Sequence, residues 1–110
     1  MKIEIIKCLQ DNYSYLIIDN INKYACVVDP GESRPIISFI ENSGIKLRYI
    51  LNTHHHYDHV GGNLELKNKY GSKIVAFEGD RDRIPGIDIL VKDNQVWKAD
   101  NFEAKIYHTP

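Results

Sequence analysis

The chain has 110 residues, of which 43% are hydrophobic, and a formal net charge of −1. This length and composition allow one small globular domain with a modest core, and they argue against a disordered chain. The near-neutral charge gives no general attraction to nucleic acid or to an anionic membrane. The longest apolar runs fall far short of the roughly 20 residues that cross a bilayer, and the N-terminus lacks a signal-peptide pattern. Cys8 and Cys26 are too few for a disulfide framework, so we expect buried thiols and a cytoplasmic, reducing location.

The first part of the chain predicts three strands. Ile3 and Ile5 alternate with polar residues, as in a half-buried strand. Tyr13–Ile18 predicts a second strand, bounded on both sides by polar turn residues. Tyr24–Val28 is apolar without a break, which predicts a third strand covered on both faces.

The next part predicts a helix and a further strand. Ser33 is the expected N-cap, Pro35 lies in the first helical turn, and Gly44 is the C-terminal stop. One face of the helix is apolar, with isoleucines at positions 36, 37 and 40. Leu47–Leu51 then predicts a fourth strand.

The remaining residues predict one more helix and several short strands. Asn63–Tyr70 reads as a short helix closed by Gly71, and Lys73–Phe77 reads as a strand. Residues 78–85 are charged and predict a loop or a single turn, and two alternating apolar patterns follow, at Ile87, Ile89 and Val91 and at Phe102, Ala104 and Ile106. This order of elements predicts an α/β fold with one mixed sheet and its helices on one face.

Four of the five histidines lie within a short segment, Thr-His-His-His-Tyr-Asp-His-Val-Gly-Gly at residues 53–62. Imidazole is a common ligand of zinc, and a carboxylate adds an oxygen donor. In an extended backbone, residues two apart point the same way. His54 and His56 can therefore reach one metal, while His55 points elsewhere.

A second half-site is predicted directly after the first. Asp58 and His59 are adjacent, and in a tight loop both can turn toward a second ion, while Gly61–Gly62 lets the backbone turn sharply into the next helix. The alternatives are a histidine-rich polar loop without function and a purification tag. A tag would sit at a terminus and would not contain the tyrosine, the aspartate and the glycine pair.

The same segment resembles a known family. Thr53–His59 matches the T-H-x-H-x-D-H signature of the metallo-β-lactamase superfamily, and Val27–Gly31 precedes it at the expected distance. Asp11–Ile17 resembles the D-N-Y-x-Y-L opening of the glyoxalase II (hydroxyacylglutathione hydrolase) branch, and Thr53–Asn63 resembles that branch as well. The resemblance covers the whole chain, which would correspond to the first half of that family's metallohydrolase domain.

This resemblance implies an αββα sandwich, of which residues 1–110 form the N-terminal portion, without a second domain. It implies a two-metal site in which His54 and His56 bind one ion, and Asp58 and His59 bind another about 3.5–4 Å away. Asp58 is also the expected catalytic residue. Zinc is the expected metal, with iron or manganese as alternatives.

The activity that the resemblance implies is hydrolysis of S-D-lactoylglutathione-type thioesters to D-lactate and glutathione. A bound metal lowers the pKa of its water from 15.7 to about 7, so that hydroxide is available at neutral pH. The expected partner is a glutathione thioester, with neither nucleic acid nor membrane. Two alternatives stay open: another hydrolase of the same fold, such as a lactonase, a persulfide dioxygenase or a nuclease, and a non-catalytic remnant.

Several neighbouring residues have competing interpretations. By resemblance, Asp29 supports the ligand loop without binding metal, whereas Asp-Pro-Gly is also a common turn; the supporting role is favoured. We interpret His55 as a loop or packing residue and Tyr57 as tolerant to exchange. Tyr13 and Tyr15 are expected to pack the sheet.

The end of the chain bears on how complete the site is. In the family the next motif reads Thr-Pro-Gly-His-Thr, and Thr109–Pro110 matches its first two positions. His108 is therefore not the expected ligand, and the remaining ligands would follow Pro110. We expect the isolated chain to be inactive, to leave an apolar sheet face open, and to need a longer companion segment or a dimer.

Overall fold

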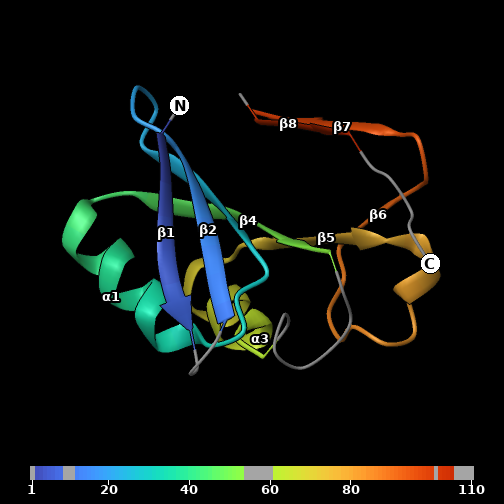
Figure 1. Cartoon of the computed structure of the whole chain (residues 1–110), viewed down its shortest axis with the longest axis horizontal. Coiled ribbons are helices and arrows are strands. Elements are labelled where there is room, and N and C mark those ends of the chain that lie inside the picture. The colour runs from blue at the N-terminus through green and yellow to red at the C-terminus, as the bar shows by residue number, and fades with distance from the viewer. Residues whose placement is uncertain (1, 9–11, 54–60, 101, 106–110) are drawn as a thin grey trace.

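The computed structural model describes residues 2–8, 12–53, 61–100 and 102–105, and it arranges them in three layers (Figure 1). A six-stranded sheet lies between a layer of two helices and a two-stranded hairpin. The elements are β1 (Lys2–Cys8), β2 (Asn12–Asp19), β3 (Tyr24–Val28), α1 (Ser33–Ser43), β4 (Lys46–Asn52), α3 (Asn63–Tyr70), β5 (Lys73–Phe77), the 3₁₀ turn η1 (Glu78–Asp80), β6 (Ile89–Val91), β7 (Val96–Ala99) and β8 (Phe102–Lys105).

The large sheet is mixed and has the order β1-β2-β3-β4-β5-β6. Its first three strands are antiparallel, and β3 to β6 run parallel. Ile50 of β4 stands beside Val27 on one side and Ile74 on the other. The mixed sheet and the predicted strands and helices up to η1 are confirmed. In the parallel part, the strand ends gather at one edge, where β3 runs into Asp29 and β4 runs into Thr53.

Both helices cover the same face of the sheet, as predicted. Ile36 and Ile40 of α1 and Leu66 of α3 are buried in one cluster with side chains from the first five strands, among them Leu16, Val27, Leu47, Ile50 and Ile74. Each helix ends at a glycine in the left-handed conformation, Gly44 at φ 71° and Gly71 at φ 68°, which a residue without a Cβ adopts without strain.

The predicted N-cap of the first helix is wrong. The helix begins at Ser33, its N-cap is Glu32, and no side chain caps it. The Ser33 hydroxyl instead donates a hydrogen bond of 2.7 Å to Glu65 Oε1 in the first turn of α3. A tertiary contact between the two helix starts has therefore taken the place of the local cap.

The opposite face carries a second core beneath the β7–β8 hairpin. Trp97 and Phe102 are 5% exposed and meet the ring of Tyr49 edge to face, at centroid distances of 5.1 and 6.1 Å. Cys26 and Val75 are buried in the same cluster. The prediction of one sheet is wrong, because β7 was not predicted and pairs with β8 apart from the large sheet.

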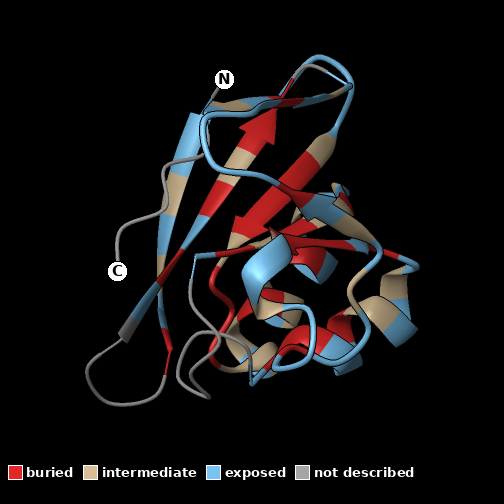
Figure 2. Cartoon of the chain, turned by 90° about the vertical axis from the view of Figure 1, so that its right-hand side faces the viewer, coloured by how far each residue is buried: buried red, intermediate tan, exposed pale blue. Residues whose placement is uncertain are grey.

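The β7–β8 hairpin does not cover the corresponding face of the β1–β2 hairpin. Ile3 and Ile5 are each 63% exposed, and Tyr13 and Tyr15 are 53% and 43% exposed. Figure 2 shows the contrast between the buried central strands and the exposed N-terminal strand. The prediction that the two tyrosines pack the sheet is wrong, whereas the predicted apolar sheet face is present. The strand predicted from Ile87 is also shorter, since β6 begins at Ile89.

The longest helix within the described ranges has 11 residues, and none there is long and apolar enough to cross a membrane.

Candidate metal centre

The four predicted ligands, His54, His56, Asp58 and His59, lie outside the described residues, as do His55 and Tyr57. His108 lies outside them too. The structure describes the chain on both sides of this segment, up to Thr53 and from Gly61 onward. Those two ends show how the fold holds the segment.

Asp29 holds the first end. Its carboxylate accepts a hydrogen bond of 2.7 Å from the Thr53 N–H through Oδ1, and a second from the Thr53 hydroxyl through Oδ2. Asp29 itself has φ 53°, and its N–H donates to the Leu51 carbonyl at 2.8 Å. The residue therefore makes the turn after β3 and also fixes the backbone immediately before His54.

The left-handed turn at Asp29 has a buried support. The Ser14 hydroxyl, in β2, donates to the Asp29 carbonyl at 2.8 Å, and Ser14 is fully buried. The Cys8 sulfur lies 3.2 Å from the same hydroxyl oxygen. A non-glycine residue in this conformation is uncommon, and the surrounding hydrogen bonds supply the free energy that keeps it there.

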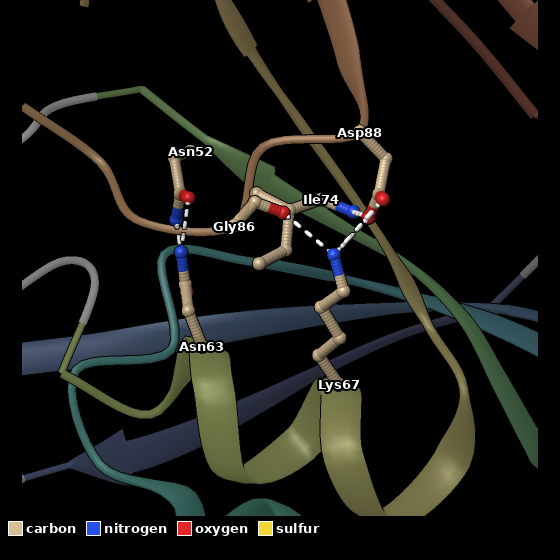
Figure 3. A network of polar contacts seen from close by, with 6 residues as sticks. All are labelled: Asn52, Asn63, Lys67, Ile74, Gly86 and Asp88. Atoms are coloured by element: carbon tan, nitrogen blue, oxygen red, sulfur yellow. Dashed lines mark hydrogen bonds and ion pairs between the residues drawn. The ribbon is translucent and has the colours of Figure 1, made fainter. Parts of the chain in front are cut away.

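Asn52 and Asn63 join the two sides of the segment (Figure 3). Asn52 Nδ2 donates to Asn63 Oδ1 at 3.3 Å, and Asn63 Nδ2 donates to Asn52 Oδ1 at 2.5 Å. Asn52 is the last residue of β4 and Asn63 the first of α3, and they are 8% and 2% exposed. A buried amide pair of this kind satisfies donors and acceptors that would otherwise be costly to bury.

Gly62 brings the second end against the Asp29 turn. Its N–H donates to the Pro30 carbonyl at 2.7 Å. A Cβ at Gly62 would lie 2.9 Å from both the Pro30 oxygen and the Ser33 nitrogen, closer than real Cβ atoms come. The glycine is therefore needed for close approach of two backbones, in addition to the sharp turn that the sequence predicted.

One turn further along α3, Lys67 makes a second anchor (Figure 3). Its ammonium donates to the Gly86 carbonyl at 2.7 Å and to both Asp88 carboxylate oxygens at 2.9 Å. Partial burial acts to raise the pKa of Asp88, but the Ile74 N–H and the Lys67 ammonium, together with the charge of Lys73, outweigh it and lower that pKa.

Neither cysteine is suited to the metal. Burial raises the pKa of Cys26 to about 12, so its thiol is protonated at neutral pH, and it lies on the hairpin side of the sheet. Cys8 is buried on the helix side. The prediction of two buried thiols is confirmed. Elsewhere in the described part of the chain, no group of three histidine, cysteine, aspartate or glutamate side chains could hold a metal ion.

The sequence did not single out Ser14, Asn52 or Asn63 as parts of this site. Each is a single polar residue within or next to a strand or helix pattern, where polar side chains usually face solvent. A buried position for a serine or asparagine follows from contacts between elements far apart in the chain. Signals were nevertheless present in the sequence: Asn52 follows the predicted apolar strand Leu47–Leu51, Asn63 ends the segment that resembles the glyoxalase II branch, and Ser14 lies within the Asp11–Ile17 resemblance.

Comparison with known proteins defines the class. A family model described as the metallo-beta-lactamase superfamily matches residues 10–89, most of the chain. The protein therefore belongs to the metallo-β-lactamase superfamily, which implies a dinuclear metal centre. The resemblance at Thr53–His59 is confirmed at this level.

Within the superfamily, the chain is similar to curated proteins named hydroxyacylglutathione hydrolase. The chain is 61% identical, over all 110 residues, to a hydroxyacylglutathione hydrolase of Pelagibacter ubique, and these residues cover 46% of that relative. It is 42% identical over 105 residues to the hydroxyacylglutathione hydrolase of Methylococcus capsulatus, covering 96% of this chain and 41% of that one. The chain thus spans about half the length of the curated relatives it matches.

Solved structures share the fold. The B3 metallo-beta-lactamase BLEG-1 superposes with a TM-score of 0.87 over 99% of this chain and 62% of its own, at 19% sequence identity. The subclass B3 metallo-beta-lactamase BJP-1 of Bradyrhizobium japonicum gives 0.73 over 89% of this chain and 46% of its own, at 25% identity. The predicted metallo-β-lactamase-like fold class is confirmed.

Proposed function

We propose that these residues form part of a hydroxyacylglutathione hydrolase and supply four of its metal ligands. The observation that carries the proposal is the 61% identity to such an enzyme along the entire chain. His54 and His56 would hold one ion, and Asp58 and His59 the other. The substrate would be S-D-lactoylglutathione or a similar glutathione thioester, and the products D-lactate and glutathione.

The donor set fits zinc. Three imidazoles and one carboxylate are nitrogen and oxygen ligands of the type that zinc takes, and no thiolate is required. When bound, the ions would supply an activated water and polarise the thioester carbonyl. Zinc is the metal we propose, with iron or manganese as outcomes that metal analysis would reveal.

The residues that the structure describes would position the ligands of this centre. Asp29 holds the Thr53 backbone and hydroxyl, and Thr53 directly precedes the first ligand. Carboxylates that position a ligand from outside the ligand set affect metal affinity and activity about 10–100-fold. We propose this supporting role for Asp29 together with its role as a turn residue. The two free thiols suit a reducing compartment, so we also propose a cytoplasmic location.

The test is a chimera in which these 110 residues replace the matching part of the Pelagibacter ubique relative. We expect the chimera to hydrolyse S-D-lactoylglutathione, to lose activity on chelation and to regain it with zinc. His54→Ala should abolish most of this activity, and His55→Ala, the matched control, should retain it. A folded chimera that binds two equivalents of zinc and leaves the thioester intact, or prefers a lactone, would contradict the proposal.

A further inference from the structure

The Asn52–Asn63 pair joins the residues that flank the ligand segment on its two sides. Asn52 ends β4 and Asn63 begins α3, so in the sequence residues 53–62 stand between the two partners. All four predicted ligands fall within this span. The pair is reciprocal, with each amide donating once and accepting once, and both side chains are buried.

Two further hydrogen bonds share the same junction. The Thr53 N–H, next to Asn52, donates to Asp29 Oδ1, and the Gly62 N–H, next to Asn63, donates to the Pro30 carbonyl. Both ends of the segment are thus tied to one turn, at residues 29 and 30, and to each other through the amide pair. Each of these hydrogen bonds joins two protein groups.

We propose that Asn52 and Asn63 are positioning residues that bring the ends of the ligand segment together before metal binds. Bringing together two points of a chain costs conformational entropy, and a metal that had to bring the ends of the segment together itself would bind more weakly by that cost. When the amide pair has formed, the ends are already together in the folded protein, and metal binding does not have to supply that entropy. The proposal rests on the proposed function for the identity of the ligands, and on the described residues alone for the closure.

Lys67 provides a matched comparison on the same helix. Like Asn63 it anchors α3 to another element, through Gly86 and Asp88, but it lies one turn away from the ligand segment (Figure 3). Loss of either anchor should loosen α3. Only loss of the Asn63 amide should free the ends of the segment.

The first measurement is hydrogen exchange on the metal-free chimera with the Pelagibacter ubique relative, comparing wild type with Asn63→Ala and Lys67→Met. In Asn63→Ala we expect protection of the Thr53 and Gly62 N–H groups to fall at least about 10-fold relative to Ile50, which reports the core of β4. In Lys67→Met the protection of Thr53 and Gly62 relative to Ile50 should be unchanged. Equal losses in both variants, or none in Asn63→Ala, would overturn the proposal.

The second measurement is Co²⁺ affinity of the same proteins, followed by absorption spectroscopy with the folded fraction checked by circular dichroism. Asn63→Ala and Asn52→Ala should each weaken binding about 10-fold, and the double variant no further, since either change alone breaks the pair. Lys67→Met should bind as wild type does. Additive losses, or wild-type affinity in Asn63→Ala, would contradict the positioning role. Neither measurement uses the thioester, so failure of the proposed reaction and failure of the closure give different results.

Discussion

The two faces of the large sheet are covered in different ways. On the helix side, α1 and α3 bury a continuous cluster from β1 to β5. On the other side, the β7–β8 hairpin covers the central strands, while Ile3, Ile5, Tyr13 and Tyr15 of the β1–β2 hairpin stay exposed. We therefore expect substitutions on the helix side to cost more stability than those on the open part of the other side. The helix side also includes α3, whose first residue, Asn63, follows the ligand segment in the sequence.

The exposed face of the β1–β2 hairpin is the part of the predicted open sheet face that the structure shows. Its apolar residues are present, as predicted. The need for a longer companion segment or a second copy of the chain to cover them stays a prediction, as does the inactivity of the isolated chain.

The largest expected effect comes from the helix side. Leu66 is fully buried, so Leu66→Ala removes packed methyl groups and leaves a cavity, and we expect a loss of about 4 kcal/mol in the free energy of unfolding. The matched change on the open face, Ile5→Ala, should cost less than about 1 kcal/mol, because that side chain is mostly in water. Urea denaturation measures both. Similar losses would show that the two faces are equally covered.

The hairpin side should give the next largest effect. Trp97→Ala removes the ring that packs on Tyr49, and we expect a loss of about 3 kcal/mol, at the low end for a buried tryptophan because β7–β8 is covered from one side. Cys26 lies in the same cluster as Trp97, and Cys8 lies on the helix side. In the Trp97→Ala variant, the rate at which a thiol reagent labels Cys26 should therefore rise more, relative to wild type, than the rate for Cys8. Equal acceleration of the two thiols would mean that the faces open together.

A third change probes the junction beside the ligand segment. In Gly62→Ala the new Cβ would meet backbone atoms of Pro30 and Ser33 at 2.9 Å, and overpacking of this kind should cost about 2 kcal/mol. Gly71→Ala, where a Cβ meets nothing within 4 Å but φ is 68°, should cost about 1 kcal/mol. Thermal unfolding compares the two. A harmless Gly62→Ala would disprove the close approach of the backbones.

The smallest expected effect concerns Asp88 and pH. Because its pKa is lower in the folded protein than the ordinary 3.8, its ionised form stabilises the fold at pH values above 3.8, and this contribution is lost as the pH falls through the folded pKa. The carboxylate and Lys67 are partly exposed, so the amount should be below about 1 kcal/mol. Asp88→Asn should therefore reduce stability at pH 7 and flatten its fall below pH 3.8. A wild-type slope in Asp88→Asn would contradict this assignment.

Much of the fold could be predicted because its signals are local. The unbroken apolar run at Tyr24–Val28 marked a central strand, and the left-handed glycines Gly44 and Gly71 marked the helix ends. The β7 strand was missed because Val96–Ala99 has only four residues, one of them buried, and is too short for a periodic pattern to stand out. The cap at Ser33 was wrong because its hydroxyl had a better partner across the helix pair.

The family and the predicted ligands could be inferred without the fold, because a signature such as Thr53–His59 depends on the order of residue types along the chain. The residues that surround this signature depend on how distant elements pack. Asp29 reaches Thr53 across 24 positions and Asn52 meets Asn63 across 11, and such partners follow from strand register and helix placement. A buried hydrogen bond stabilises through geometry and exclusion of water, and neither exists until the separate elements have packed.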